Sequence, residues 1–218
     1  MPKKVYLVRH GESGYGAKGI YQTYDTPLSP AGIKQAEVLA RRFSTIPIDV
    51  IYASPLPRAR QTADIINASL VQNLDALREI KRPSEIIGKP LADGPSLAIK
   101  RQLIVHVSDP TWHYSDEENF YEVRDRSLEL LKLLEEDEAQ NILLVSHAMI
   151  LRVLFMVMAF GRNAGHEIHQ NLYSHFRMTQ TGITLLEHNG RGWLLMTWND
   201  YAHLGDDTTE SFYKRQDI

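Results

Sequence analysis

The chain has 218 residues, of which 43% are hydrophobic and 23% are charged, and its formal net charge is −3. This composition is ordinary for a soluble globular protein, and the small negative charge argues against a nucleic-acid-binding function. The chain has no cysteine, which excludes disulfides, thiolate metal sites and cysteine nucleophiles. Its apolar runs are too short for a signal peptide or a membrane span. We therefore expect one cytoplasmic domain over residues 1–218, with neither a membrane nor a nucleic acid as partner.

Apolar periodicity predicts that strands and helices alternate along most of the chain. Short runs rich in β-branched residues predict strands over 4–9, 49–54, 74–77 and 141–147. Helical spacing predicts helices over 30–43, from Ser54-Pro55 onward, over 119–138 and over 149–160. Asn189-Gly190 predicts a hairpin within 182–199. This alternation is typical of an α/β three-layer sandwich, with a mostly parallel central sheet flanked by helices.

Residues 80–118 interrupt this alternation of strands and helices. They contain Gly88, Gly94 and four prolines, at positions 83, 90, 95 and 110. We interpret them as a lid inserted over the site rather than as a second core. Five basic residues make this segment locally basic: Lys81, Arg82, Lys89, Lys100 and Arg101. The simpler interpretation is a solvated face, and the alternative is that these residues steer a polyanionic substrate toward the site.

Three predicted strands end in, or are closely followed by, arginine or histidine side chains. The first ends in Arg9 and His10, the second is followed by Arg58, and the last ends in His147. Glu79 follows the short run at 74–77. Because parallel strands place their carboxyl ends at one edge of a sheet, these side chains should share one crevice.

Such a crevice suits a phosphoryl group. Guanidinium groups match phosphate oxygens in bidentate geometry, and nearby helix N-termini add N–H donors. A neutral histidine can attack phosphorus when one ring nitrogen is free and the other donates its proton to a fixed acceptor. The leaving oxygen needs a proton, and Glu79 is the nearest candidate acid.

Five separated motifs carry a family resemblance: "LVRHGES", "TPLSPAGIKQA", "ASPLPRARQTA", "LREI" and "LLVSHAMILR". They resemble the histidine phosphatase superfamily, whose members include cofactor-dependent phosphoglycerate mutase. The resemblance implies that His10 is the phosphorylated nucleophile and that Arg9, Arg58 and His147 hold the phosphoryl oxygens. It further implies that Glu79 is the proton donor and then the base for water, with no metal and no cofactor.

The chain also departs from the family pattern. Ala148 stands where the family usually has glycine after the histidine; we expect this added methyl to be tolerated beside the substrate. Ser13-Gly14-Tyr15 and "IKRPSEIIGKP" replace signatures that are typical of the mutases. These differences favour a phosphatase for a phosphomonoester. The alternatives are a mutase-type phosphotransferase and a non-catalytic phosphate-binding protein.

Several residues have two interpretations. Gln22 could contact the substrate or be a plain loop residue, and Arg60 is interpreted as a structural ion-pair residue. Glu118 and Asn119 open the helix after the lid and could contribute to the pocket, with helix capping as the simpler role. The His166/His169 pair lacks a clear third ligand, so we expect no metal site. The partner should be a small phosphorylated substrate, whose class stays open, and the C-terminal hairpin could pair with a second copy as a homodimer.

Overall fold

The structure is a computed structural model that describes residues 2–205. A sheet of six strands, in the order β3-β2-β4-β1-β5-β6, forms its centre. The first four strands in this order pair in parallel, whereas β5 and β6 are antiparallel. The strands are β1 (Lys3–Arg9), β2 (Val50–Ala53), β3 (Val71–Asn73), β4 (Asn141–Ser146), β5 (Ile183–His188) and β6 (Trp193–Asp200).

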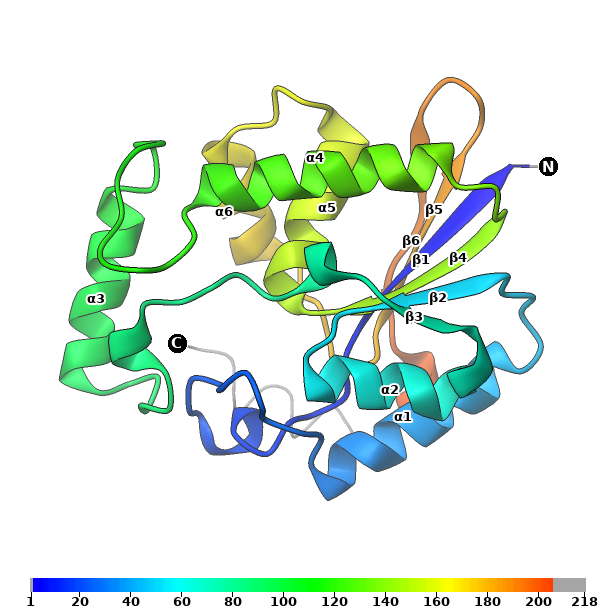
Figure 1. The fold of residues 1–218 in the computed structure, drawn as a ribbon, viewed down its shortest axis with the longest axis horizontal. Helices are drawn as coiled ribbons and strands as arrows, with labels where there is room; N and C mark the ends of the chain where they lie inside the picture. Colours follow the sequence, from blue (N-terminus) through cyan, green and yellow to red (C-terminus); the bar gives the residue numbers. More distant parts are fainter. Residues whose placement is uncertain (1, 206–218) are drawn as a thin grey trace.

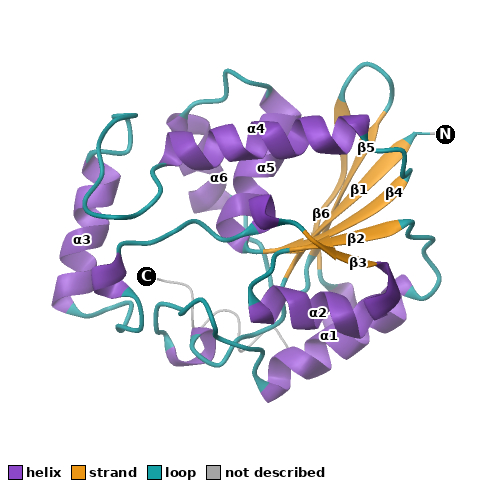
Figure 2. Cartoon of the chain, in the orientation of Figure 1, coloured by secondary structure: helices purple, strands orange, loops and turns teal. Residues whose placement is uncertain are grey.

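Helices cover both faces of this sheet (Figures 1 and 2). Helices α1 (Pro30–Phe43) and α2 (Pro57–Asn67) lie on one face, and α4 (Phe120–Glu136), α5 (Ala148–Phe160) and α6 (His166–His175) lie on the other. The strand residues alternate accordingly, because successive side chains of a strand point to opposite faces. Leu7 and Leu144 pack toward α4 and α5, whereas Val8 and Val145 pack toward α1 and α2. The predicted α/β three-layer architecture is confirmed.

Two predicted boundaries are wrong. The predicted strand at 74–77 is a 3-10 turn over Asp75–Leu77, and strand β3 ends before it. Leu74 and Leu77 are three residues apart and both pack into the core, a spacing that suits a helical turn better than a strand. The helix predicted from Ser54-Pro55 begins at Pro57, because Ser54 turns its hydroxyl toward His147 instead of capping the helix.

The segment 80–118 contains helix α3 (Gly94–Val105), which the sequence did not predict. In Figure 1, α3 stands on the side of the molecule toward which the parallel strands run. The segment pairs with the loop after β1: Tyr21 N–H donates to Lys89 O at 2.9 Å, and Leu91 N–H donates to Gly19 O at 2.8 Å. It therefore lies against the loop that follows β1 and the candidate residues Arg9 and His10.

The predicted hairpin is present as β5 and β6, and Gly190 at its turn has a positive φ of 86°. Strand β6 lies at the edge of the sheet and exposes Leu194, Leu195 and Met196. Pairing of this edge with a second copy stays a prediction. Within residues 2–205, no helix is both long and apolar enough to cross a bilayer.

Candidate active site

The carboxyl ends of β1, β2 and β4 bring the predicted residues together. Arg9 lies opposite Ser146 in the register of β1 and β4, and the His10 N–H donates to Ser146 O at 2.9 Å. The rings of His10 and His147 are 5.0 Å apart, edge to face. His147 Nε2 lies 2.8 Å from the hydroxyl of Ser54, which follows β2. The sheet thus places both histidines in one buried cluster.

The geometry of His10 leaves one ring nitrogen available. Its Nδ1 lies 2.6 Å from Gly11 O, and a carbonyl only accepts, so Nδ1 carries the proton and Nε2 is free. The side chain is buried, and this burial, together with the charges of Arg58 and Arg9, holds the pKa of His10 well below its usual value. His10 is therefore a neutral imidazole with a free lone pair on Nε2.

Gly11 fixes this arrangement by close packing. A Cβ at Gly11 would lie 2.6 Å from the carbonyl oxygen of Gly32, at the start of α1, so only glycine fits there. The Gly11 N–H donates to Thr62 Oγ1 at 3.1 Å, and the Thr62 hydroxyl in turn donates to Arg58 O at 2.8 Å. Gly11, whose carbonyl orients His10, is thus packed against α1 and hydrogen-bonded to α2. Thr62 is a member of this network that the sequence reasoning missed, although it lies one helical turn after Arg58.

Backbone carbonyls orient the guanidinium groups of the two predicted arginines. Arg9 Nη1 donates to Met178 O at 2.6 Å, and Arg58 Nη1 donates to Thr23 O at 3.2 Å. Burial lowers the pKa of each guanidinium to about 10, so both stay charged at neutral pH. Among the described residues, the buried Arg9 Nε, Arg58 Nε and His147 Nδ1 have no hydrogen-bond partner. Unpaired buried polar groups are costly, and the two guanidinium Nε–H groups are donors that an anion would satisfy.

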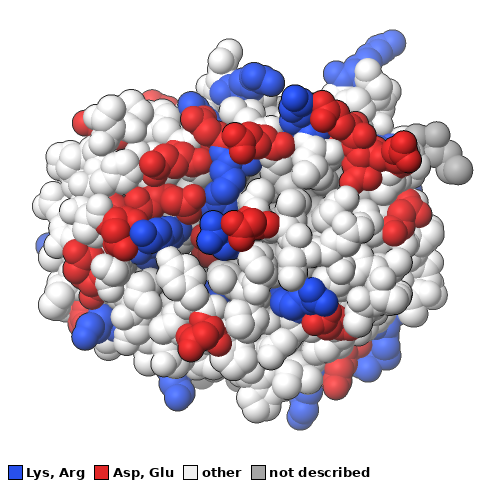
Figure 3. Space-filling view, in the orientation of Figure 1, with Lys and Arg blue, Asp and Glu red and all other residues white. Residues whose placement is uncertain are grey.

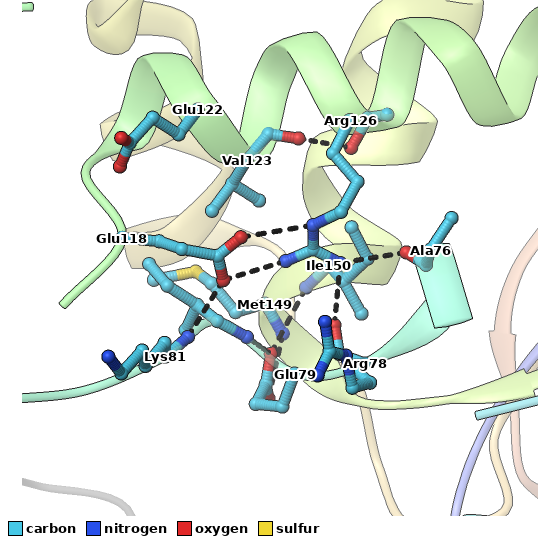
Figure 4. Close-up of polar contacts among 12 residues, drawn as sticks. Ala76, Arg78, Glu79, Lys81, Glu118, Glu122, Val123, Arg126, Met149 and Ile150 are labelled. Carbon is cyan, nitrogen blue, oxygen red and sulfur yellow. Dashed lines mark hydrogen bonds and ion pairs between the residues drawn. The ribbon is translucent and has the colours of Figure 1, made fainter. Parts of the chain in front are cut away.

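The Glu79 carboxylate lies against the first turn of α5, which directly follows His147 (Figure 4). One carboxylate oxygen accepts from the N–H groups of Ile80 at 3.0 Å and Ile150 at 3.3 Å, and the other accepts from Met149 N–H at 3.4 Å. Met149 and Ile150 belong to the first turn of α5, where N–H groups have no partner within the helix. The negative charge of Glu79 raises the pKa values of Arg9 and Arg58 against the effect of burial, so it acts on both cations.

Gln22 and Ala148 also border this region. Gln22 lies in the loop after β1, and its buried amide oxygen has no partner among the described residues. Ala148 is the first residue of α5, directly after His147. Their contact with a substrate stays a prediction.

Arg152 is a further cation that the sequence reasoning did not assign to the site. It lies one turn after Ala148 on α5, donates through Nε to Phe176 O at 3.2 Å, and stacks over the Tyr173 ring at 5.3 Å. After burial, its charge is the largest cause of the lowered pKa of Arg9. An arginine within the apolar run 150–160 was the available signal.

Other predicted side chains lie apart from this cluster. Arg60 bonds Asp64 at 2.8 Å and Asn73 at 3.0 Å, as expected for a structural residue. Asn119 caps α4 in a reciprocal capping box with Glu122, as predicted. His169 packs against the Phe120 ring, and no group of three metal-ligating residues gathers anywhere in residues 2–205.

The 80–118 segment is less basic than its lysines and arginines suggested. It holds five basic residues and six acidic ones, including Asp116, Glu117 and Glu118. Lys81 pairs with Asp116 at 3.1 Å. Figure 3 shows basic and acidic side chains intermingled on this face of the molecule. Steering of a polyanion by this segment therefore has no continuous basic patch to support it on the face shown.

Comparison with known proteins agrees with this arrangement. The sequence profile of the histidine phosphatase superfamily (branch 1) matches residues 5–201. "Putative phosphoserine phosphatase 2" of Hydrogenobacter thermophilus is 32% identical over 207 residues, covering 92% of this chain and 97% of that protein. "Probable phosphoglycerate mutase GpmB" of Citrobacter koseri is 30% identical over 217 residues, covering 92% and 94% of the two chains.

Solved structures share the fold. A phosphoserine phosphatase mutant from Entamoeba histolytica, in complex with phosphoserine, superposes with a TM-score of 0.72 at 26% identity, covering 92% of this chain and 98% of that one. The motifs, the fold and the profile match over nearly the whole chain together make this protein an enzyme of the histidine phosphatase superfamily, of the phosphomonoesterase type.

Proposed function

We propose that the protein hydrolyses a phosphomonoester without a metal, through a phosphohistidine on His10. The observation that carries this proposal is a neutral imidazole, with Nε2 free, beside buried guanidinium groups whose Nε–H groups lack partners. Arg9, Arg58 and His147 would hold the phosphoryl oxygens, and the positive charge would stabilise the transferring group. Gln22 and Ala148 would border the rest of the substrate.

The reaction would take place in two steps. His10 Nε2 forms a bond to phosphorus while the bond to the leaving oxygen breaks. Glu79, a carboxylate in the free protein, would take up a proton as the negatively charged substrate binds and donate it to the leaving oxygen. The resulting Glu79 carboxylate then takes a proton from water, whose oxygen attacks phosphorus. The bond from phosphorus to Nε2 breaks, phosphate leaves, and His10 and the Glu79 acid are restored.

Segment 80–118 would serve as the lid in this proposal. Its pairing with residues 19–21 and its position beyond the parallel strands support that role. A lid that admits water after the leaving group departs favours hydrolysis, whereas one that excludes water favours transfer to a second hydroxyl.

The test is hydrolysis of p-nitrophenyl phosphate in EDTA, comparing the wild type with His10→Ala. We expect turnover by the wild type and a loss of at least about 10³-fold in the variant, because the nucleophile is removed. Phosphate binding without turnover by the wild type would favour the non-catalytic alternative. Conversion of 3-phosphoglycerate to its isomer, with little phosphate released, would favour the mutase.

We further propose that the substrate is a small phosphomonoester that also carries a carboxylate. The support is a third cation near the phosphate-binding arginines: the charge of Arg152 lowers the pKa of Arg9. The charge of Glu79 raises the pKa values of Arg9 and Arg152, but one carboxylate offsets only part of the charge of three arginines. Two of the relatives described above are named phosphoserine phosphatases.

This substrate class predicts a preference that can be measured. We expect phosphoserine to exceed phosphoethanolamine, which lacks the carboxylate, by roughly tenfold or more in kcat/KM, since a charge-assisted hydrogen bond would be lost. Arg152→Met should reduce this ratio toward one. Equal use of both substrates by the wild type would contradict the proposed carboxylate.

A further inference from the structure

The backbone just before Glu79 is held by side chains rather than by a strand. Three consecutive carbonyls are fixed from elsewhere in the chain (Figure 4 shows the outer two): Ala76 O accepts from Arg126 Nη1 at 2.7 Å, Leu77 O from Ser146 Oγ at 2.5 Å, and Arg78 O from Arg126 Nη1 at 2.8 Å. One nitrogen of Arg126 therefore bonds on both sides of Leu77, immediately before the candidate acid.

Glu118 orients Arg126. Its carboxylate accepts from Arg126 Nε at 3.1 Å and from Nη2 at 2.9 Å, a bidentate pairing that fixes the plane of the guanidinium. The same carboxylate accepts from Lys81 N–H at 2.9 Å, and Glu118 N–H donates to Lys81 O at 3.1 Å. The pair thus holds the chain on both sides of Glu79: residues 76 and 78 through Arg126, and residue 81 through Glu118 (Figure 4).

The pair of Arg126 and Glu118 lies on and just before helix α4, which is firmly packed against the core. Its side chains Val123, Leu130 and Leu134 are buried in the core, and its first turn is capped by Asn119. The side chains of Arg126 and Glu118 are only 17% and 26% exposed, so the pair is more shielded from solvent than a surface salt bridge. Glu118 also ends the 80–118 segment, so the contact that orients Arg126 joins that segment to the backbone around Glu79.

We propose that Arg126, oriented by Glu118, is a positioning residue that holds Glu79 where it can protonate the leaving oxygen. This inference rests on the proposed role of Glu79. General acids work over hydrogen-bond distances, so a small displacement of the Glu79 backbone would slow proton transfer while leaving phosphate binding by Arg9 and Arg58 in place. A merely structural contact between α4 and the turn would instead affect every substrate alike.

The test compares leaving groups that differ in their need for a proton. p-Nitrophenolate leaves readily as an anion, whereas the alkoxide of phosphoserine requires protonation. Single-turnover phosphorylation is measured, because Glu79 would also serve the later attack by water. We expect Arg126→Met to slow phosphorylation by phosphoserine by roughly tenfold or more, and phosphorylation by p-nitrophenyl phosphate by no more than about threefold. Glu118→Gln should show the same selectivity to a smaller degree.

Three further variants make the result decisive. Arg124→Met, which removes an arginine on the same helix paired with the adjacent Asp125, should leave both rates unchanged. Glu79→Gln should show the selective loss at full size, and the double variant Glu79→Gln/Arg126→Met should lose no more than Glu79→Gln alone. If Arg126→Met slows both substrates equally while Glu79→Gln remains selective, the positioning role is wrong. If Glu79→Gln itself slows both equally, Glu79 is not the acid, and the proposed mechanism is wrong along with the positioning role.

Discussion

The cationic side of the site and its carboxyl side are held by different kinds of structure. Arg9 ends β1, and His10 and His147 directly follow β1 and β4, so the register of two central strands sets their positions. Glu79 follows an irregular turn, and side chains that lie about 50 and 70 residues later in the chain fix its backbone. Most of the proposed phosphate-binding side thus lies at strand ends, whereas the proposed acid, Glu79, is held through polar contacts. Substitutions on the two sides should have different signatures.

The largest effect in this comparison should come from the cationic side. Arg58→Ala removes a buried cation, and we expect kcat/KM to fall by about 10²–10³-fold, as when a donor to developing charge is lost. Arg60→Ala is the matched control, because Arg60 lies on the same helix but bonds Asp64 and Asn73. Its kcat/KM should stay within about twofold of the wild type. Equal losses in the two variants would show that charge on α2, rather than the Arg58 contact, matters.

A smaller effect should appear in the pH dependence of stability. His10 has a pKa well below 6.5 in the folded protein, so the unfolded chain binds more protons below that pH, and stability falls as the pH drops. From pH 6.5 to 5.5 this contribution is about 1 kcal/mol in the free energy of unfolding. His10→Asn should therefore lose stability less steeply than the wild type in this range, as measured by urea unfolding without phosphate.

The half-exposed His113 provides a control of opposite sign. Its hydrogen bond to Glu122 raises its pKa, so its contribution is present below pH 6.5 and is lost as the pH rises through the folded pKa. His113→Asn should steepen the acid loss of stability, whereas His10→Asn should flatten it. The same direction of change in both variants would contradict a neutral, buried His10.

The same contrast explains what the sequence could predict. Strands β1 and β4 are apolar runs that end in Arg-His and Ser-His, and parallel pairing brings such ends to one edge. The motifs therefore predicted that Arg9, His10, Arg58 and His147 would lie close to one another. The turn at 74–77 was mistaken for a strand, because its apolar residues pack as one helical turn. Helix α3 was missed because Gly94 and Pro95, which open it, were interpreted as loop signals.

Contacts between a helix and a distant turn could not be predicted. Arg126 is one of several charged residues on α4, and nothing in its local pattern sets it apart from Arg124. Its role depends on how α4 lies over the turn before Glu79, which the core contacts of that helix decide. The influence of Arg152 on the pKa of Arg9 likewise depends on where α5 lies relative to the end of β1, which the sequence pattern does not fix.

The most direct test of the central claim is to trap the intermediate. The wild type is mixed with ³²P-labelled phosphoserine, quenched in alkaline denaturant, and digested to locate the label. We predict an acid-labile, base-stable phosphate on the peptide that contains His10, and no label in His10→Ala. Turnover by the wild type with the label on another residue, or turnover that persists in His10→Ala, would contradict a phosphohistidine mechanism on His10.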